Sequence, residues 1–165
     1  MSISAVADTS FLIDWARYTK RDLLFSIFKV SIPESVLGEI KSENTISWIA
    51  QKLAEENMYL FTETPDLREE AFRIIEMSRR YPVKSIDYPE AVCIAIGRKH
   101  NYIVLSENGG AYMSQFIYLK DVKVWRAFEV LLELYNRKMI DKDEFIKYQI
   151  DTFHEFPRKD VERII

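Results

Sequence analysis

Cysteine, glycine and histidine are all scarce in this chain of 165 residues. The single cysteine, Cys93, excludes an internal disulfide, and its apolar neighbours predict a small buried side chain. With only four glycines and no segment rich in proline, glycine and serine, the chain offers few hinges or linkers. The two histidines, His100 and His154, lie in charged or polar contexts, so we assign neither of them a chemical role. These scarcities indicate that residues 1–165 form one compact domain.

Long apolar runs and an excess of positive charge are also missing. No uninterrupted apolar run approaches the ~18 residues of a membrane span, and no cationic start precedes one, so we expect a cytoplasmic protein without a membrane partner. The net charge of -3 argues against a protein that grips duplex nucleic acid through overall positive charge. A local acidic cluster that holds metal ions can still act on phosphates.

What the chain does contain is an alternation of short β-rich apolar runs with longer helical patterns. This alternation is typical of βαβ units and predicts a mainly parallel sheet. The expected strands are residues 3–7, 29–32, 58–61, 102–105 and 122–125. Hydrophobic residues make up 48% of the chain, which is enough to bury a sizeable core.

Helical patterns fill the intervals between these runs. We expect a first helix that continues through residues 11–28, and another that begins at Thr64 as its N-cap. The segment 85–96 is apolar on nearly every side and predicts the most buried helix. Two further helices should follow residue 125, the second of them opened by a capping box of Asp141 and Glu144. Pro157 should close that helix.

Acidic side chains stand where such a sheet would gather them. Asp8 follows the first strand, Glu39 lies just off the apolar face of a helix, Glu90 opens the buried helix, and Glu107-Asn108 follows the fourth strand. Strand ends and helix starts share one edge of a parallel sheet, so these residues can converge on one pocket. Several carboxylates in one pocket repel each other unless cations neutralise them, and Mg²⁺ or Mn²⁺ prefers such oxygen ligands.

Four segments carry a resemblance to a known family. Residues 7–13, 32–40, 87–95 and 102–108 resemble, in order and spacing, the acidic motifs of the PIN domain, the nuclease domain of VapC-type toxins and related RNA-processing proteins. The resemblance covers about residues 2–125 as the core. The helices of about residues 126–157 resemble the C-terminal extensions of some PIN-like proteins. The resemblance to the PIN domain implies a three-layer α/β/α sandwich.

The resemblance also implies a function. It predicts a ribonuclease that hydrolyses RNA phosphodiester bonds with Mg²⁺ or Mn²⁺, with Asp8, Glu39 and Glu90 as catalytic metal ligands. Glu107 and Asn108 would complete the ligand set. The supporting residues would be Thr9, Ser10 and Asp87. A toxin with an antitoxin partner, and a homodimer, are the assemblies that the resemblance suggests.

The fourth motif departs from the family pattern. Many members have an aspartate where this chain has Asn108, and an amide adds no negative charge, so metal binding would be weaker. A catalytically weak module that binds RNA or a protein is therefore the alternative. The clusters Lys20-Arg21, Arg79-Arg80 and Arg98-Lys99 could guide an RNA backbone, or could simply be solvated helix faces.

Each acid also has a purely structural interpretation. Glu90 and Asp87 fit a capping box, in which Asp87 is a cap rather than a ligand. Glu39 fits a solvated helix acid, and Glu107 fits a turn before Gly109-Gly110. Asp14 has no strand-end placement and is expected on a helix surface. Asp8 is the hardest to explain this way, because a buried acid after an apolar strand needs hydrogen-bond or ionic partners.

Overall fold

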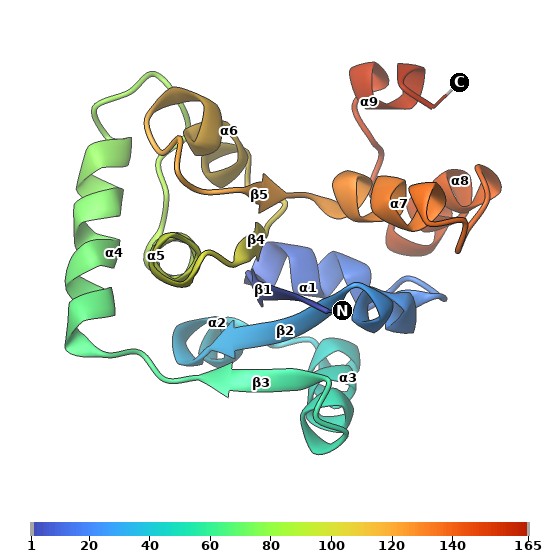
Figure 1. Ribbon diagram of the computed structural model, residues 1–165, viewed down its shortest axis with the longest axis horizontal. Coiled ribbons are helices and arrows are strands. Elements are labelled where there is room, and N and C mark those ends of the chain that lie inside the picture. The colour runs from blue at the N-terminus through green and yellow to red at the C-terminus, as the bar shows by residue number, and fades with distance from the viewer. Residues whose placement is uncertain (1, 165) are drawn as a thin grey trace.

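The computed structural model describes residues 2–164 and contains a five-stranded sheet in which every pairing is parallel. The strands lie in the order β3-β2-β1-β4-β5 (Figure 1). Their bounds are β1 (Ile3–Ala7), β2 (Phe28–Pro33), β3 (Met58–Phe61), β4 (Ile103–Leu105) and β5 (Val124–Trp125). The parallel sheet predicted from the sequence is confirmed, and β1 and β3 match the expected residues.

Helices connect the strands and form the outer layers of the three-layer α/β/α fold, which is also confirmed. Before β4 the chain forms α1 (Thr9–Trp15), the 3-10 helix η1 (Arg21–Ser26), α2 (Glu34–Glu39), α3 (Glu43–Ala54), α4 (Pro65–Ser78) and α5 (Tyr88–His100). After β4 come α6 (Gly109–Ile117), α7 (Ala127–Asn136), α8 (Asp143–Thr152) and α9 (Arg158–Glu162). Nowhere in residues 2–164 is a helix both long and apolar enough to span a membrane.

The strand order creates a switch point between β1 and β4. The chain builds β1, β2 and β3 toward one edge of the sheet, then crosses over and adds β4 and β5 on the other side of β1. In open parallel sheets a crevice forms outside the carboxyl ends of the strands at such a point. Here the backbone N–H of Asp8 donates to the carbonyl of Leu105 at 2.9 Å, so the two strand ends stay together one residue beyond β1.

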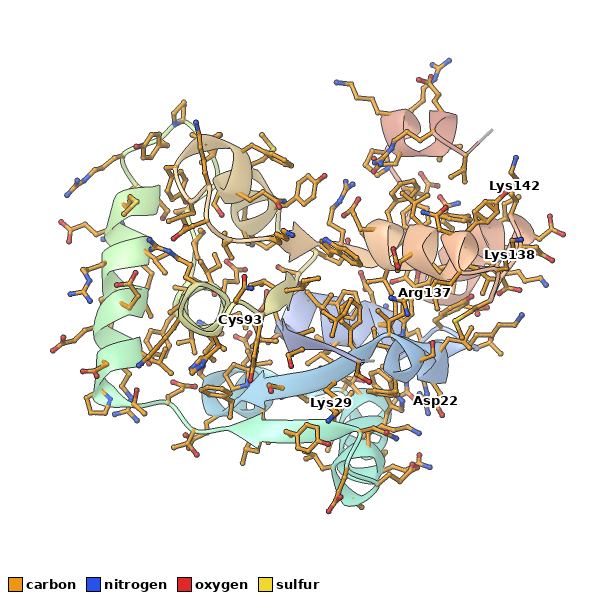
Figure 2. All side chains as sticks on the ribbon, in the orientation of Figure 1. Asp22, Lys29, Cys93, Arg137, Lys138 and Lys142 are labelled. Atoms are coloured by element: carbon orange, nitrogen blue, oxygen red, sulfur yellow. The ribbon has the colours of Figure 1, made fainter. Side chains whose placement is uncertain are left out.

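α5 is the most buried helix, as the sequence predicted. Its residues from Glu90 to Gly97 are all buried, and it packs against the central strands. Cys93 lies on this helix beside the sheet (Figure 2) and is fully buried, with its Sγ 3.6 Å from the carbonyl oxygen of Ala7. The expectation of a small buried cysteine is confirmed.

An aromatic cluster attaches the C-terminal helices to α1. The rings of Trp15 and Tyr18 lie 5.4 and 5.1 Å from the ring of Tyr148 on α8, and all three side chains are buried. Just after α8, His154 lies 3.6 Å from Glu107, so the end of α8 is close to the carboxyl edge of the sheet. Figure 1 shows α7, α8 and α9 on the opposite side of the molecule from α4.

The expectation of one continuous helix over residues 11–28 is wrong. α1 ends at Trp15, whose indole Nε1 donates to the carbonyl of Arg21 at 2.8 Å. The guanidinium of Arg21 in turn donates to the carbonyl of Ala16 at 2.7 Å. These contacts stabilise a turn and the separate helix η1. They form between side chain and backbone across the turn, which an apolar periodicity does not reveal.

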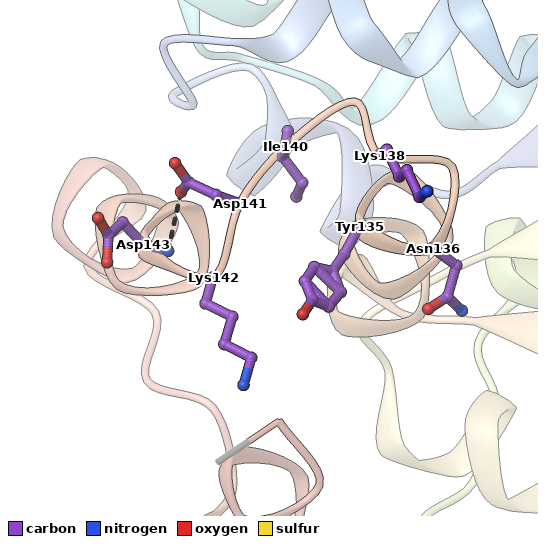
Figure 3. A pocket seen from close by; sticks show the side chains of 7 residues that line it. All are labelled: Tyr135, Asn136, Lys138, Ile140, Asp141, Lys142 and Asp143. Carbon is purple, nitrogen blue, oxygen red and sulfur yellow. Dashed lines mark hydrogen bonds between the residues drawn. The ribbon is translucent and has the colours of Figure 1, made fainter.

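The capping box expected at Asp141 and Glu144 is also wrong. Glu144 is buried and accepts hydrogen bonds from the Tyr18 hydroxyl and the Lys20 ammonium, each at 2.8 Å. Asp141 instead accepts from the backbone N–H of Asp143 at 3.0 Å (Figure 3). The pocket in Figure 3, about 670 Å³ on the connection between α7 and α8, contains none of the acids predicted for the site.

The C-terminal region contains one more helix than expected. α8 ends at Thr152, where Phe153 adopts a left-handed conformation with φ of 59°, so Pro157 does not close it. Pro157 instead precedes α9. α6 was also not predicted, because the Gly109-Gly110 pair that begins it was interpreted as a turn.

Candidate metal and active site

Asp8 is the buried centre of the candidate site. It caps α1, and its Oδ1 accepts the backbone N–H of Thr9 at 2.8 Å. Its Oδ2 accepts the hydroxyls of Ser106 at 3.1 Å and Ser10 at 3.2 Å. The side chain is 1% exposed, and this burial raises the pKa of Asp8 to about 6 although the hydrogen bonds act in the opposite direction. A buried carboxylate that has no ion pair with any residue of the described range 2–164 therefore lies at the switch point.

Glu90 is the second buried acid, and its capping role is present. The backbone N–H of Glu90 donates to Asp87 Oδ1, and that of Asp87 donates to Glu90 Oε2, both at 3.1 Å. The other oxygen, Oε1, accepts from the amide Nδ2 of Asn108 at 2.5 Å. The pKa of Glu90 is raised to about 7, mainly by burial and in smaller part by the charge of Asp8. The influence of Asp8 shows that the two acids share one electrostatic environment.

Asn108 joins the two acids through Ser106. Its backbone N–H donates to the Ser106 hydroxyl at 3.1 Å, and that hydroxyl donates to Asp8. Its side-chain oxygen caps α6 by accepting the N–H of Ala111 at 3.0 Å, which leaves the amide nitrogen for Glu90. A continuous path of hydrogen bonds therefore runs from Asp8 through Ser106 and Asn108 to Glu90.

Glu39 reaches the same network from the exposed side. It is the last residue of α2, and its Oε1 accepts a hydrogen bond from the Thr9 hydroxyl. Thr9 also donates its backbone N–H to Asp8, so one residue links both carboxylates. All three acids predicted as catalytic thus belong to one hydrogen-bonded set, which we call the acid network: Asp8, Glu39, Glu90, Thr9, Ser10, Ser106 and Asn108.

The acid network offers the oxygen ligands that hard divalent cations prefer. Within residues 2–164, no three Asp, Glu, His or Cys side chains stand close enough together to hold an ion as they are. Oxygens of all three acids are occupied by protein donors, as described above. The raised pKa values of the two buried carboxylates show that their ionised forms are poorly compensated in this environment. A cation would compensate their negative charge. The donors are of the oxygen type that a hard divalent cation takes, and the three carboxylates would have to turn away from their present donors to meet on one ion.

Glu107, expected as a ligand, turns its carboxylate elsewhere. Its backbone N–H donates to Ser10 at 3.1 Å, but its Oε1 accepts the N–H of Ala127 at 2.5 Å and its Oε2 lies 3.6 Å from His154 Nε2. Burial raises the pKa of Glu107 to about 7. The carboxylate caps α7 and pairs with the C-terminal segment, so we leave it out of the ligand set.

His154, to which we assigned no chemical role, contacts two acids, one of them Asp14, which lies on helix α1 as expected. His154 Nδ1 lies 3.2 Å from Asp14 Oδ2, and this hydrogen bond is the main cause that raises the pKa of His154. The imidazole therefore lies between Asp14 and Glu107, in the segment that follows α8. No local pattern links these residues, because they come from three distant parts of the chain.

Ser106 was not predicted as a site residue, although it bridges Asp8 and Asn108. It is fully buried, and its position directly after β4 was the available signal. In the register of β1 and β4, Ala7 pairs with Leu105, so Asp8 and Ser106 are the next residues on each strand. The strand ends therefore align the serine with the aspartate.

The comparisons with known proteins decide the family. The family model DUF3368, described as a PIN domain, matches residues 4–156. The chain belongs to the PIN domain family. The match extends beyond the predicted core into the segment of α7 and α8. No curated protein matches the chain in sequence.

Solved structures of PIN domain proteins have a similar fold at low sequence identity. VapBC2 from Rickettsia felis, bound to a DNA fragment from its promoter, is 9% identical with a TM-score of 0.53 and covers 75% of this chain and 98% of its own. VapC20 from Mycobacterium tuberculosis, a toxin that cleaves the sarcin-ricin loop, is 20% identical with a TM-score of 0.51, covering 67% and 94%. PAE2754 from Pyrobaculum aerophilum is 12% identical with a TM-score of 0.52, covering 82% and 99%.

Proposed function

We propose that this PIN domain is an endoribonuclease that depends on Mg²⁺ or Mn²⁺. The observation that carries the proposal is the acid network, in which hydrogen bonds connect Asp8, Glu39 and Glu90 at the switch point of the sheet. The sequence places these acids far apart, and the fold brings them into one hydrogen-bonded set. The family membership supports the same function.

Each residue of the acid network has a distinct role in this proposal. The buried Asp8 and Glu90 and the exposed Glu39 would hold the cation. Thr9 and Ser10 orient the carboxylate of Asp8, and Asn108 fixes the carboxylate of Glu90. A divalent cation held there would lower the pKa of a water molecule and stabilise negative charge on the scissile phosphate.

Asp87 has a supporting role as the cap of α5. Its carboxylate accepts the N–H of Glu90, which fixes where the helix and its first acid begin. We therefore place Asp87 in the second layer around the site and not among the ligands.

The proposed substrate is RNA, single-stranded or structured, and the proposed location is the cytoplasm. Among similar structures, VapC20 is a toxin that cleaves the sarcin-ricin loop, and VapBC2 was solved with promoter DNA. On that basis we propose that the chain is the toxin of a toxin-antitoxin pair, with an antitoxin protein as its partner and a homodimer as its assembly. A small open reading frame beside its gene would support the proposal of an antitoxin partner.

A cleavage assay tests the nuclease proposal. Purified protein should cut single-stranded RNA with Mn²⁺ and stop when EDTA is added. The Asp8→Asn and Glu90→Gln variants should lose at least a hundredfold in rate, because each removes a charged ligand. Glu76→Gln, which changes an exposed acid of α4, is the matched control and should cut normally. Cleavage by Asp8→Asn at the normal rate would reject the assignment.

A second candidate is a catalytically weak module that binds RNA or a partner protein. The observation that favours it is the hydrogen bond from Asn108 to Glu90, since the amide donor compensates part of the charge that a cation would otherwise compensate. Titration calorimetry separates the two candidates. Absence of Mn²⁺ binding at millimolar metal, with RNA or partner binding intact, would favour the module over the nuclease.

A further inference from the structure

A pocket of about 460 Å³ opens directly beside the acid network. Its lining includes the buried Glu90 and Asn108, and the exposed Asp87, Arg79 and Lys84. Neither cation has an ion pair or a side-chain hydrogen bond to any residue within 2–164. Two unpaired cations therefore stand next to the proposed metal ligands.

The segment that carries these cations is held in place. A Cβ atom at Gly110 would overlap with the carbonyl oxygen of Lys84, so the segment lies directly against the first turn of α6. The backbone N–H of Ile86 donates to the hydroxyl of Ser78 at 3.2 Å. Tyr81 stacks on Tyr118, which directly follows α6, with ring centroids 4.6 Å apart and planes 8° apart. These contacts fix the backbone on both sides of Lys84, and its position relative to the acids is therefore set by the fold.

We propose that Arg79 and Lys84 bind a backbone phosphate of single-stranded RNA in this pocket, next to the phosphate that the acid network would cleave. The inference rests on the proposed function, because it takes RNA as the substrate. Acids alone repel a polyanion, so a chain with a net charge of -3 needs local cations to hold the strand beside them. An unpaired strand fits a concave pocket of this size, because its backbone can bend into it.

The test measures binding separately from cleavage. Affinity for a fluorescent single-stranded RNA is measured in an Asp8→Asn background with Mg²⁺, over a range of salt concentrations. The Arg79→Gln/Lys84→Gln pair should weaken binding on the order of tenfold at low salt. It should also reduce the slope of log K against log salt by about 1.4, because each phosphate contact on a single strand contributes about 0.7.

A matched control removes the same charge elsewhere. Lys99 and Lys123 are exposed and lie at the end of α5 and just before β5, at the opposite edge of the sheet from the acids. The Lys99→Gln/Lys123→Gln pair should change affinity less than twofold. Both double variants should unfold at the same temperature as the parent, because all four side chains are exposed.

The outcomes separate this inference from the nuclease proposal. Selective loss of binding at Arg79 and Lys84 supports the phosphate site even if no RNA is ever cleaved. Equal losses in the two double variants, or no RNA binding by the parent, would overturn it even if cleavage is confirmed. Equal affinity for a duplex of the same sequence would overturn the assignment to single strands. In the active protein, the Arg79→Gln/Lys84→Gln pair should raise KM for RNA and leave kcat within twofold of the parent value.

Discussion

Asn108 is the residue that sets this site apart from the acidic pattern that the sequence resembles. Its amide nitrogen donates to Glu90, while its oxygen caps α6. An aspartate at this position could still cap the helix, since Asp and Asn are equally good N-caps. It could not donate to Glu90. The amide therefore allows the two side chains to meet in the absence of a cation.

The Asn108→Asp variant tests this role of the amide. Without metal, it should lose about 2 kcal/mol of unfolding free energy, because a buried hydrogen bond is replaced by two adjacent carboxylates. Mn²⁺ should restore that loss and bind more tightly than to the parent protein. Urea unfolding with EDTA and with Mn²⁺ measures both effects, and Asn136→Asp on the exposed end of α7 is the control. Unchanged stability of the variant in EDTA would show that the amide of Asn108 does not compensate the charge of Glu90.

The raised pKa values of Asp8 and Glu90 predict how stability depends on pH. Their folded-state pKa values are about 6 and about 7, above the ordinary 3.8 and 4.5. Folding therefore favours the protonated acids, which contribute to the free energy of unfolding. This stabilising contribution is fully present below the ordinary pKa values and is lost as pH rises through 6 to 7. The metal-free protein should be less stable at pH 8 than at pH 5.

The Asp8→Asn variant isolates the share of Asp8 in this pH dependence. A neutral amide does not ionise, so the variant should be more stable than the parent at pH 8 by on the order of 3 kcal/mol at most. At pH 4 the two proteins should be similar. Urea unfolding in EDTA from pH 4 to 8 gives the comparison. Parallel pH profiles would mean that burial does not shift the pKa of Asp8.

At the level of elements, the first turn of α6 determines where the segment with Lys84 lies. A Cβ at Gly110 would overlap with the Lys84 carbonyl, whereas a Cβ at Gly109 meets nothing within 4 Å. The two neighbouring glycines therefore have different functions. Gly110 allows close packing, and Gly109 only begins the helix.

Alanine substitutions at the two glycines test this packing. Gly110→Ala should cost about 2 kcal/mol of unfolding free energy, because the helix and the segment must move apart. Gly109→Ala should be neutral or stabilise by up to about 1 kcal/mol, since alanine favours helix. Thermal and urea unfolding measure the pair side by side. A neutral Gly110→Ala variant would show that the segment is not held against α6.

The C-terminal helices are tied to the sheet edge by polar as well as aromatic contacts. Glu107 lies beside His154, and Arg126 donates to Asp160 of α9 at 2.9 Å. Arg126 also stacks over the ring of Tyr112 on α6, with 4.0 Å between guanidinium and ring centroid. The carboxylate after β4 thus stabilises the packing of the C-terminal segment, which explains why it is turned away from Asp8.

For the whole molecule, the sequence was sufficient where a local pattern decides the structure. Strands β1 and β3 and the Thr64 cap of α4 match the prediction, because each is an apolar run or cap bounded by clear signals. The three acids were proposed from their positions after a strand and on helices, together with the resemblance to the acidic motifs of the family. Strand order then brings them together.

Other features depend on contacts between distant segments and could not be predicted. The break after Trp15 rests on its bond to the Arg21 carbonyl, and α6 begins at a glycine pair that alone suggests a turn. The pairing of Glu107 with His154 joins segments without any shared periodicity. The sequence therefore indicated the three acids that the fold brings together, but not Ser106, which bridges Asp8 and Asn108, nor the contacts of Glu107 with His154.

The central claim is that the acid network captures a divalent cation. A crystal structure of the protein soaked in Mn²⁺ tests it most directly, through the anomalous scattering of the metal. We expect one or two peaks bounded by oxygens of Asp8, Glu39 and Glu90, and none in crystals of the Asp8→Asn variant. Well-ordered acids without an anomalous peak at millimolar Mn²⁺, or a peak only at other residues, would contradict the account.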